Sequence, residues 1–208
     1  MPIAEEIAQA RAHEHWIWDS AAEVGVVADV RRRFAGGLLY QVIENAGAVR
    51  ALLVAVDGEP RYGSAAALIR PIFEMFVRAL WINNCADDAE VAHVSEPAND
   101  DEAWNPRIRA MTQLVDDRNA LGGRLIGLHG RYWDAFCSYA HGGLRIVGRR
   151  NADDFIGNVA TEGEMIEIIR FATLMALLAA SVWFDIAGNG ELARQATARA
   201  APYWAPQV

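Results

Sequence analysis

The segment FATLMALLAASVWF, residues 171–184, is the longest apolar run of the chain without a charged side chain. Its 14 residues fall short of the roughly 18 or more that a membrane-spanning helix needs, so we expect a buried core helix. Upstream, Thr161-Glu162-Gly163-Glu164 has the Thr-x-x-Glu pattern of a capping box, which predicts the start of this helix. Gly188-Asn189-Gly190 predicts its end near Ala187.

On both sides of this segment, apolar residues recur mainly at helical spacing. The pattern predicts helices over residues 4–18, 33–56, 64–84, 87–94, 105–119, 131–141 and 191–201. Pro71 predicts a kink, the four glycines of residues 121–130 predict a turn region, and residues 142–158 read mostly as loop with a short extended piece at 144–147. No series of alternating strands is present. We therefore predict an all-α fold, a bundle of about five to seven helices, forming one domain over residues 1–208.

Composition excludes several classes of protein. The 208 residues include 19 cationic side chains, all of them arginine, against 27 acidic ones, for a net charge of −8. Without lysine, the chain supplies no Schiff base, pyridoxal phosphate anchor or P-loop lysine. The acidic balance excludes a protein that coats nucleic acid over its whole surface. A hydrophobic content of 53% excludes disorder for most of the chain.

The cysteines and the N-terminal residues indicate where the protein resides. Cys85 and Cys137 are far apart in the sequence, which favours free thiols in a reducing compartment. Residues 1–15 contain no apolar run typical of a signal peptide. We expect a cytoplasmic protein with no membrane association, no cofactor and no metal.

A first polar stripe follows the helix predicted over residues 64–84. Arg70, Glu74 and Arg78 stand at i, i+4 and i+8, within an arc of about 80°, on a helix that is otherwise mostly apolar. One interpretation is a narrow solvent face with two helical ion pairs. The other is a pocket wall where Glu74 orients two guanidinium groups toward an anion.

A second stripe lies on the helix predicted over residues 131–141, where Arg131, Asp134, Ser138 and His141 share an arc of about 80°. The geometry argues against a catalytic triad in this set, because Asp134 and His141 would lie about 10 Å apart along the axis. His141 has three candidate roles: a C-terminal helix cap, a general acid/base, and a metal ligand. No partner stands at metal-ligand spacing, so the first two are the stronger interpretations.

Basic residues gather after His141. Gly142, Gly143 and Gly148 alternate with Arg145, Arg149 and Arg150, a combination that can cradle a phosphate or carboxylate. The alternative is a solvated loop whose arginines pair with nearby aspartates. Arg31-Arg32-Arg33 forms a second basic cluster, which reads as a solvated helix start.

Two of these segments carry a resemblance. The Arg70-x-x-x-Glu74 helix and Tyr139-Ala140-His141-Gly142-Gly143 resemble the "R-x-x-x-E" and "Tyr-x-His-Gly-Gly" segments of an uncharacterised family of bacterial helical proteins. That family is distantly similar to HEPN-like bundles, many of which are ribonucleases of defence and toxin systems. The resemblance covers roughly residues 64–150 and implies the fold more than a reaction. Arg131 and His141 would lie about 15 Å apart on a straight helix, too far to act as the HEPN arginine–histidine pair.

Two functions follow as hypotheses. The first is a binding or interaction module, in which the arginines of the two stripes and the basic segment, with Glu74 and Ser138, hold a small anion or a partner. Seven tryptophans are also compatible with a homo-oligomer. The second is a metal-independent, HEPN-like ribonuclease in which arginine binds phosphate and His141 transfers a proton. Spatial convergence of the two stripes is the feature that separates a site from two unrelated solvent faces.

Overall fold

The computed structural model describes residues 2–25, 29–54, 59–96, 107–143, 151–152, 155–156 and 160–204. These residues form an all-α bundle, as predicted. The helices are α1 (Ile3–Ala21), α2 (Val30–Leu53), α3 (Tyr62–Ala67), α4 (Ile69–Asn84), α5 (Asp88–Ser95), α6 (Ile108–Arg118), α7 (Arg124–Ala140), α9 (Glu162–Ile186) and α10 (Gly190–Trp204). Two short strands, β1 (Asn151–Ala152) and β2 (Phe155–Ile156), pair antiparallel in the stretch expected to be mostly loop.

The apolar helix α9 lies at the centre of the bundle. It packs against α1, α2, α10 and α4, and Met175, Leu177 and Phe184 are completely buried. The predicted capping box is confirmed: Glu164 N–H donates to Thr161 Oγ1 at 3.3 Å, and Thr161 N–H donates to Glu164 Oε2 at 2.9 Å. Within the described ranges, α9 is also the one helix long and apolar enough to cross a membrane, and 56% of its apolar stretch is buried inside the bundle.

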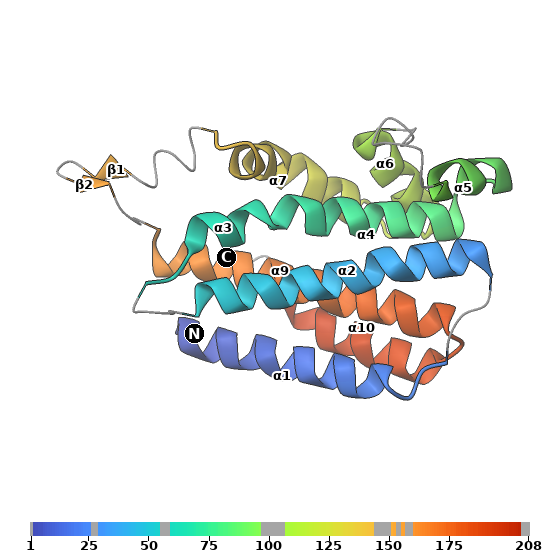
Figure 1. The fold of residues 1–208 in the computed structure, drawn as a ribbon, viewed down its shortest axis with the longest axis horizontal. Helices are drawn as coiled ribbons and strands as arrows, with labels where there is room; N and C mark the ends of the chain where they lie inside the picture. Colours follow the sequence, from blue (N-terminus) through green and yellow to red (C-terminus); the bar gives the residue numbers. More distant parts are fainter. Residues whose placement is uncertain are drawn as a thin grey trace.

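Helices farther from α9 form a second layer over α4, and this layer positions the polar stripes (Figure 1). α2 packs between α9 and α4, and α4 in turn contacts α6 and α7. α4 is therefore covered on one side by the central helices and on another by α7. The polar stripe on α4 can therefore contact side chains of α7 as well as solvent.

The helix expected over residues 64–84 is divided in two. α3 ends and α4 begins at Leu68, whose φ of −78° and ψ of −15° interrupt the regular hydrogen bonding. Pro71 is the third residue of α4, where a backbone N–H would have no partner within the helix. The interruption predicted at Pro71 thus lies three residues earlier, and the proline stands in the first turn of the second helix at no loss of a hydrogen bond.

α7 begins seven residues before its predicted start at residue 131, so the turn expected over residues 121–130 is limited to its first part. Gly122 and Gly123 have positive φ and form the turn, but Gly127 and Gly130 lie inside the helix. The reason is Asp116 on α6, whose buried carboxylate accepts hydrogen bonds from the N–H groups of Gly123, Leu125 and Ile126 at 2.7–3.0 Å. These bonds offset the roughly 1 kcal/mol that each helical glycine costs.

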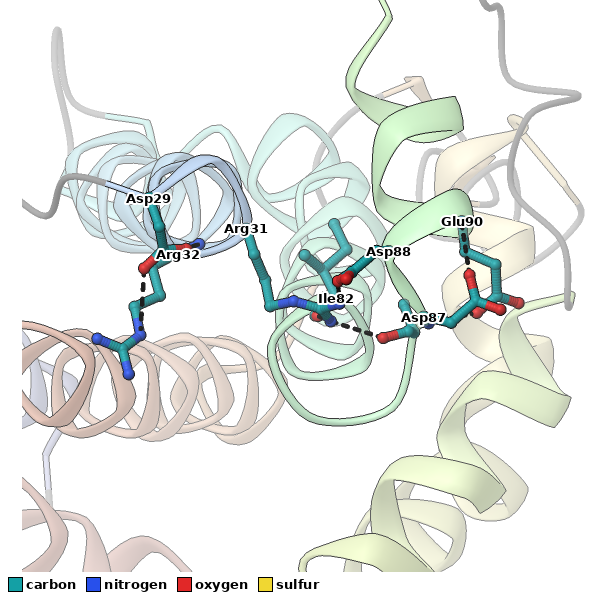
Figure 2. Close-up of polar contacts among 8 residues, drawn as sticks. Asp29, Arg31, Arg32, Ile82, Asp87, Asp88 and Glu90 are labelled. Carbon is teal, nitrogen blue, oxygen red and sulfur yellow. Dashed lines mark hydrogen bonds and ion pairs between the residues drawn. The ribbon is translucent and has the colours of Figure 1, made fainter.

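Arg31 corrects the interpretation of residues 31–33 as a solvated helix start. Its guanidinium donates to the carbonyl oxygens of Ile82 and Ala86, at 2.7 and 2.6 Å, and to Asp88 Oδ1 at 2.7 Å (Figure 2). Because the Ile82 carbonyl lies in the last turn of α4 and the Ala86 carbonyl just after it, Arg31 joins the start of α2 to the end of α4 and the start of α5. Arg32 has an exposed ion pair with Asp29, as a solvated cation would.

Arg31 and Arg32 provide a matched pair of substitutions. We expect Arg31→Ala to lower the free energy of unfolding by about 1–2 kcal/mol, because two carbonyl groups lose a charged donor. Arg32→Ala, which removes an exposed charge, should change it by less than about 0.5 kcal/mol. Urea unfolding of the two variants measures the difference. Equal effects would show that the carbonyl contacts of Arg31 do not stabilise the bundle.

Candidate functional site

The two polar stripes meet where α4 lies against the end of α7. Arg70 of α4 donates from Nη1 to Nε2 of His141, the residue that follows the last turn of α7 and lies 71 positions away in the sequence. A guanidinium has no acceptor, so the imidazole nitrogen must accept this hydrogen bond, and the ring proton is then on Nδ1. The structure therefore brings together residues that helical spacing alone could not place relative to one another.

Further contacts fix Arg70 in this position. Its Nε donates to Glu74 Oε1 at 2.7 Å, and its guanidinium carbon lies 5.1 Å from the centre of the Trp133 ring. Glu74 Oε2 is 3.7 Å from Arg78 Nη2. We call Arg70, Glu74, Arg78, Trp133 and His141 the polar cluster. The first three are 16–23% exposed, so the stripe is neither buried nor a free solvent face.

The end of α7 explains how His141 is held. Gly142 has a φ of +65°, and Gly143 N–H donates to the carbonyl of Ser138 at 2.7 Å, which together form a Schellman motif. A Cβ on Gly143 would lie 2.6 Å from Ser138 Oγ and 3.0 Å from its Cα, so only glycine fits there. The predicted helix stop at Gly142-Gly143 is confirmed, and it sets the direction in which the imidazole leaves the helix.

The other predicted site residues that the structure describes, Arg131 and Ser138, lie at other positions of α7. Ser138 packs beneath Gly143. Arg131 lies 5.8 Å from the centre of the Tyr132 ring and lines a groove between α7 and α9. Arg145, Arg149 and Arg150 lie outside the described residues. Asp134 lies on the exposed side of α7.

Sequence reasoning missed Trp133. It precedes His141 by eight residues, which places both within about 80° on the same helix face. The spacing that grouped Asp134, Ser138 and His141 could have included it, but an aromatic side chain reads as core. In the structure Trp133 instead supplies the ring surface against which Arg70 is held.

The charges of the polar cluster favour an anion. Arg70 and Arg78 place two guanidinium groups beside the single carboxylate of Glu74. Within the described ranges, Nη2 of Arg70 has no hydrogen-bond partner. That nitrogen can donate to a phosphate or carboxylate oxygen without breaking an existing contact.

Metal-ligating side chains and thiols are the other groups that could carry chemistry. The part of the chain that the structure describes contains no group of three or more histidine, cysteine, aspartate or glutamate side chains placed to hold a metal ion. Cys85 and Cys137 are free thiols, as predicted. Burial is the main cause that raises the pKa of Cys85, which works against a reactive thiolate at neutral pH.

His129 lies behind the polar cluster, in the contact between α7 and α4. Its ring stacks on Trp133 with centroids 4.6 Å apart and packs against Phe73, and it is 7% exposed. Its Nε2 has no hydrogen-bond partner among the described residues. Burial lowers the pKa of His129, and the positive charge of Arg109 lowers it further, whereas Asp134 opposes the change. The folded state therefore favours the neutral imidazole.

This burial predicts a pH dependence of stability. The unfolded chain takes up a proton on His129 near pH 6.5, before the folded chain does, so the free energy of unfolding should decrease as the pH falls below that value. His129→Phe removes this contribution. We expect urea unfolding to show that the free energy of unfolding decreases less between pH 7.5 and pH 5.5 for His129→Phe than for the wild type. His15→Gln, at an exposed position of α1, is the control. An equal loss in all three proteins would contradict the prediction.

Comparison with known families gives a match over most of the chain. The model of DUF6988, a family of unknown function, matches residues 40–205, a range that includes α4, α7 and the whole polar cluster. No curated protein and no solved structure matches the chain. The family match and the all-helical fold agree with the resemblance to an uncharacterised family of helical proteins. The chain belongs to DUF6988, a family whose function is unknown.

Proposed function

We propose that the protein is a binding module whose polar cluster holds a phosphate or carboxylate group of a ligand or partner. The observation that supports this most is the contact between Arg70 and His141, which joins the two polar stripes into one partly exposed site with two guanidinium groups. Two stripes facing solvent separately would have supported only a structural role.

The geometry around Arg70 supports binding because the side chain is already oriented. Glu74, His141 and the ring of Trp133 contact its guanidinium from three helical positions. A side chain that is fixed before binding loses little conformational entropy when a ligand arrives. The Nη2 group left over then offers a charged donor at a set position, which suits an oxygen of a planar carboxylate or of a phosphate.

A metal-independent, HEPN-like ribonuclease is the second candidate, and the same contact favours it in part. An arginine to bind phosphate and a histidine to move a proton now lie together, which Arg131 and His141 on one helix could not achieve. However, Nε2 of His141 already accepts a hydrogen bond from Arg70, so this nitrogen is not free to accept a proton from a ribose hydroxyl. The arrangement therefore favours binding over catalysis.

A direct binding experiment tests the first candidate. Inorganic pyrophosphate and a short mixed-sequence RNA serve as anionic probes, and isothermal titration calorimetry measures their affinity. We expect Arg70→Gln to weaken the affinity for the probe by about tenfold or more, since a charged hydrogen bond is lost. Arg11→Gln is the matched control, because it removes the same charge from an exposed position of α1, a helix that packs on α2 and α9. Equal weakening by both substitutions would indicate nonspecific attraction only.

A cleavage assay separates the two candidates. Wild type and His141→Ala are incubated with the same RNA in EDTA, and circular dichroism confirms that both are folded. The binding proposal predicts intact RNA in both reactions. Cleavage by the wild type that disappears in the folded His141→Ala variant would contradict the binding proposal and support the ribonuclease.

A further inference from the structure

A second concave site lies on a different face of α7 from the polar cluster. It is a groove of about 470 Å³ between α3, α7, α9 and the end of α10, and its size is in the range of small-molecule sites. We call it the aromatic groove. The rings of Tyr132, Phe171 and Trp204, from three different helices, supply much of its wall. None of the five residues of the polar cluster lines it.

Two of the four charged residues in the aromatic groove already have contacts within the protein. Arg170 forms an ion pair with the buried Glu6 and donates to the carbonyl of Pro202. Glu164 belongs to the capping box that begins α9. The charge of Arg170 is thus paired, and the carboxylate of Glu164 is held at the start of α9 by hydrogen bonds from Thr161.

Arg131 and Glu167 are different. Both are exposed and line the aromatic groove, one on α7 and the other on α9. Among the described residues neither forms an ion pair, with the other or with a third side chain. The groove thus has one uncompensated positive and one uncompensated negative group beside a wall of aromatic rings.

The floor of the aromatic groove offers one more polar group. Tyr62, which is 2% exposed, donates its hydroxyl hydrogen to the hydroxyl oxygen of Tyr139 at 3.3 Å. The Tyr139 hydroxyl hydrogen then has no acceptor among the described residues, and it can donate to a ligand. Apolar walls with a few polar groups are typical of sites that fix the orientation of a small ligand.

We propose that the aromatic groove binds a small aromatic zwitterion, a molecule with a planar ring, an ammonium group and a carboxylate. The ring stacks on the aromatic side chains. The carboxylate pairs with Arg131, and the ammonium group pairs with Glu167. This assignment is independent of the polar cluster, because it uses other residues and both signs of charge.

Three indole compounds test the proposal in calorimetric titrations. L-Tryptophan carries both charges, tryptamine only the ammonium group, and indole-3-propionate only the carboxylate. We expect tryptophan to bind about three- to fivefold more tightly than either of the others, as is usual for one exposed ion pair. No binding of any probe, or equal affinities for all three, would overturn the proposal.

Substitutions then assign each charge. Glu167→Gln should weaken the binding of tryptophan and tryptamine by about three- to fivefold and leave that of indole-3-propionate unchanged. Arg131→Gln should weaken the binding of tryptophan and indole-3-propionate by the same factor and leave that of tryptamine unchanged. Glu44→Gln and Arg11→Gln, at exposed positions of α2 and α1, are the matched controls. All four positions are exposed, so the variants should fold, and circular dichroism verifies this. Loss of affinity that is the same for all three probes would contradict the assigned pairing.

Discussion

Glu6→Ala is expected to lower the free energy of unfolding by about 3–5 kcal/mol, one of the largest effects of any single substitution in this chain. Glu6 of α1 is 2% exposed, and its Oε1 lies 2.5 Å from Nη1 of Arg170 in the middle of α9. Removal of the carboxylate leaves a mostly buried guanidinium with the Pro202 carbonyl and the Tyr203 ring as its contacts. An uncompensated buried charge is the reason for the large effect.

The neighbouring residue provides the control. Glu5 precedes Glu6 on the exposed side of α1, and Glu5→Ala should change the free energy of unfolding by less than about 0.5 kcal/mol. Urea unfolding followed by circular dichroism compares the two variants with the wild type. A loss below about 1 kcal/mol for Glu6→Ala would show that the pair does not hold α1 against α9.

Asp116→Ala should destabilise the protein by about 2–4 kcal/mol. The buried carboxylate accepts three backbone N–H groups at the start of α7, and alanine would leave these donors unpaired in the contact with α6. Hydrogen exchange should also become faster at Leu125 and Ile126 than in the rest of α7. Asp117→Ala, next to it and exposed, should have little effect. Unchanged exchange at Leu125 and Ile126 would show that the carboxylate does not fix this helix start.

The sequence was sufficient to predict those features that depend on residues close to one another in the chain. The capping box at Thr161 and the helix stop at Gly142-Gly143 are both confirmed, because each is formed by groups within a few residues of one another. The all-α fold was predictable for the same reason, since apolar spacing along each helix is local.

The features that the sequence did not reveal depend on partners far along the chain. α7 starts early because of Asp116, on another helix, and Arg31 is bound by carbonyl groups more than 50 residues away. The contact between Arg70 and His141 belongs to the same class. Spacing places a residue on a helix face, but only the packing of helices decides which faces meet.

The measurement that tests the polar cluster most directly is a double-mutant cycle on pyrophosphate affinity, with Arg70→Gln, His141→Ala and the double variant. If His141 orients Arg70 for the anion, removing the second residue has little further effect once the first is gone, and the double variant should bind about as weakly as Arg70→Gln alone. Calorimetric titration at one salt concentration gives the four affinities. Strictly additive losses, or a wild type that does not bind pyrophosphate, would contradict the account of a single joined site.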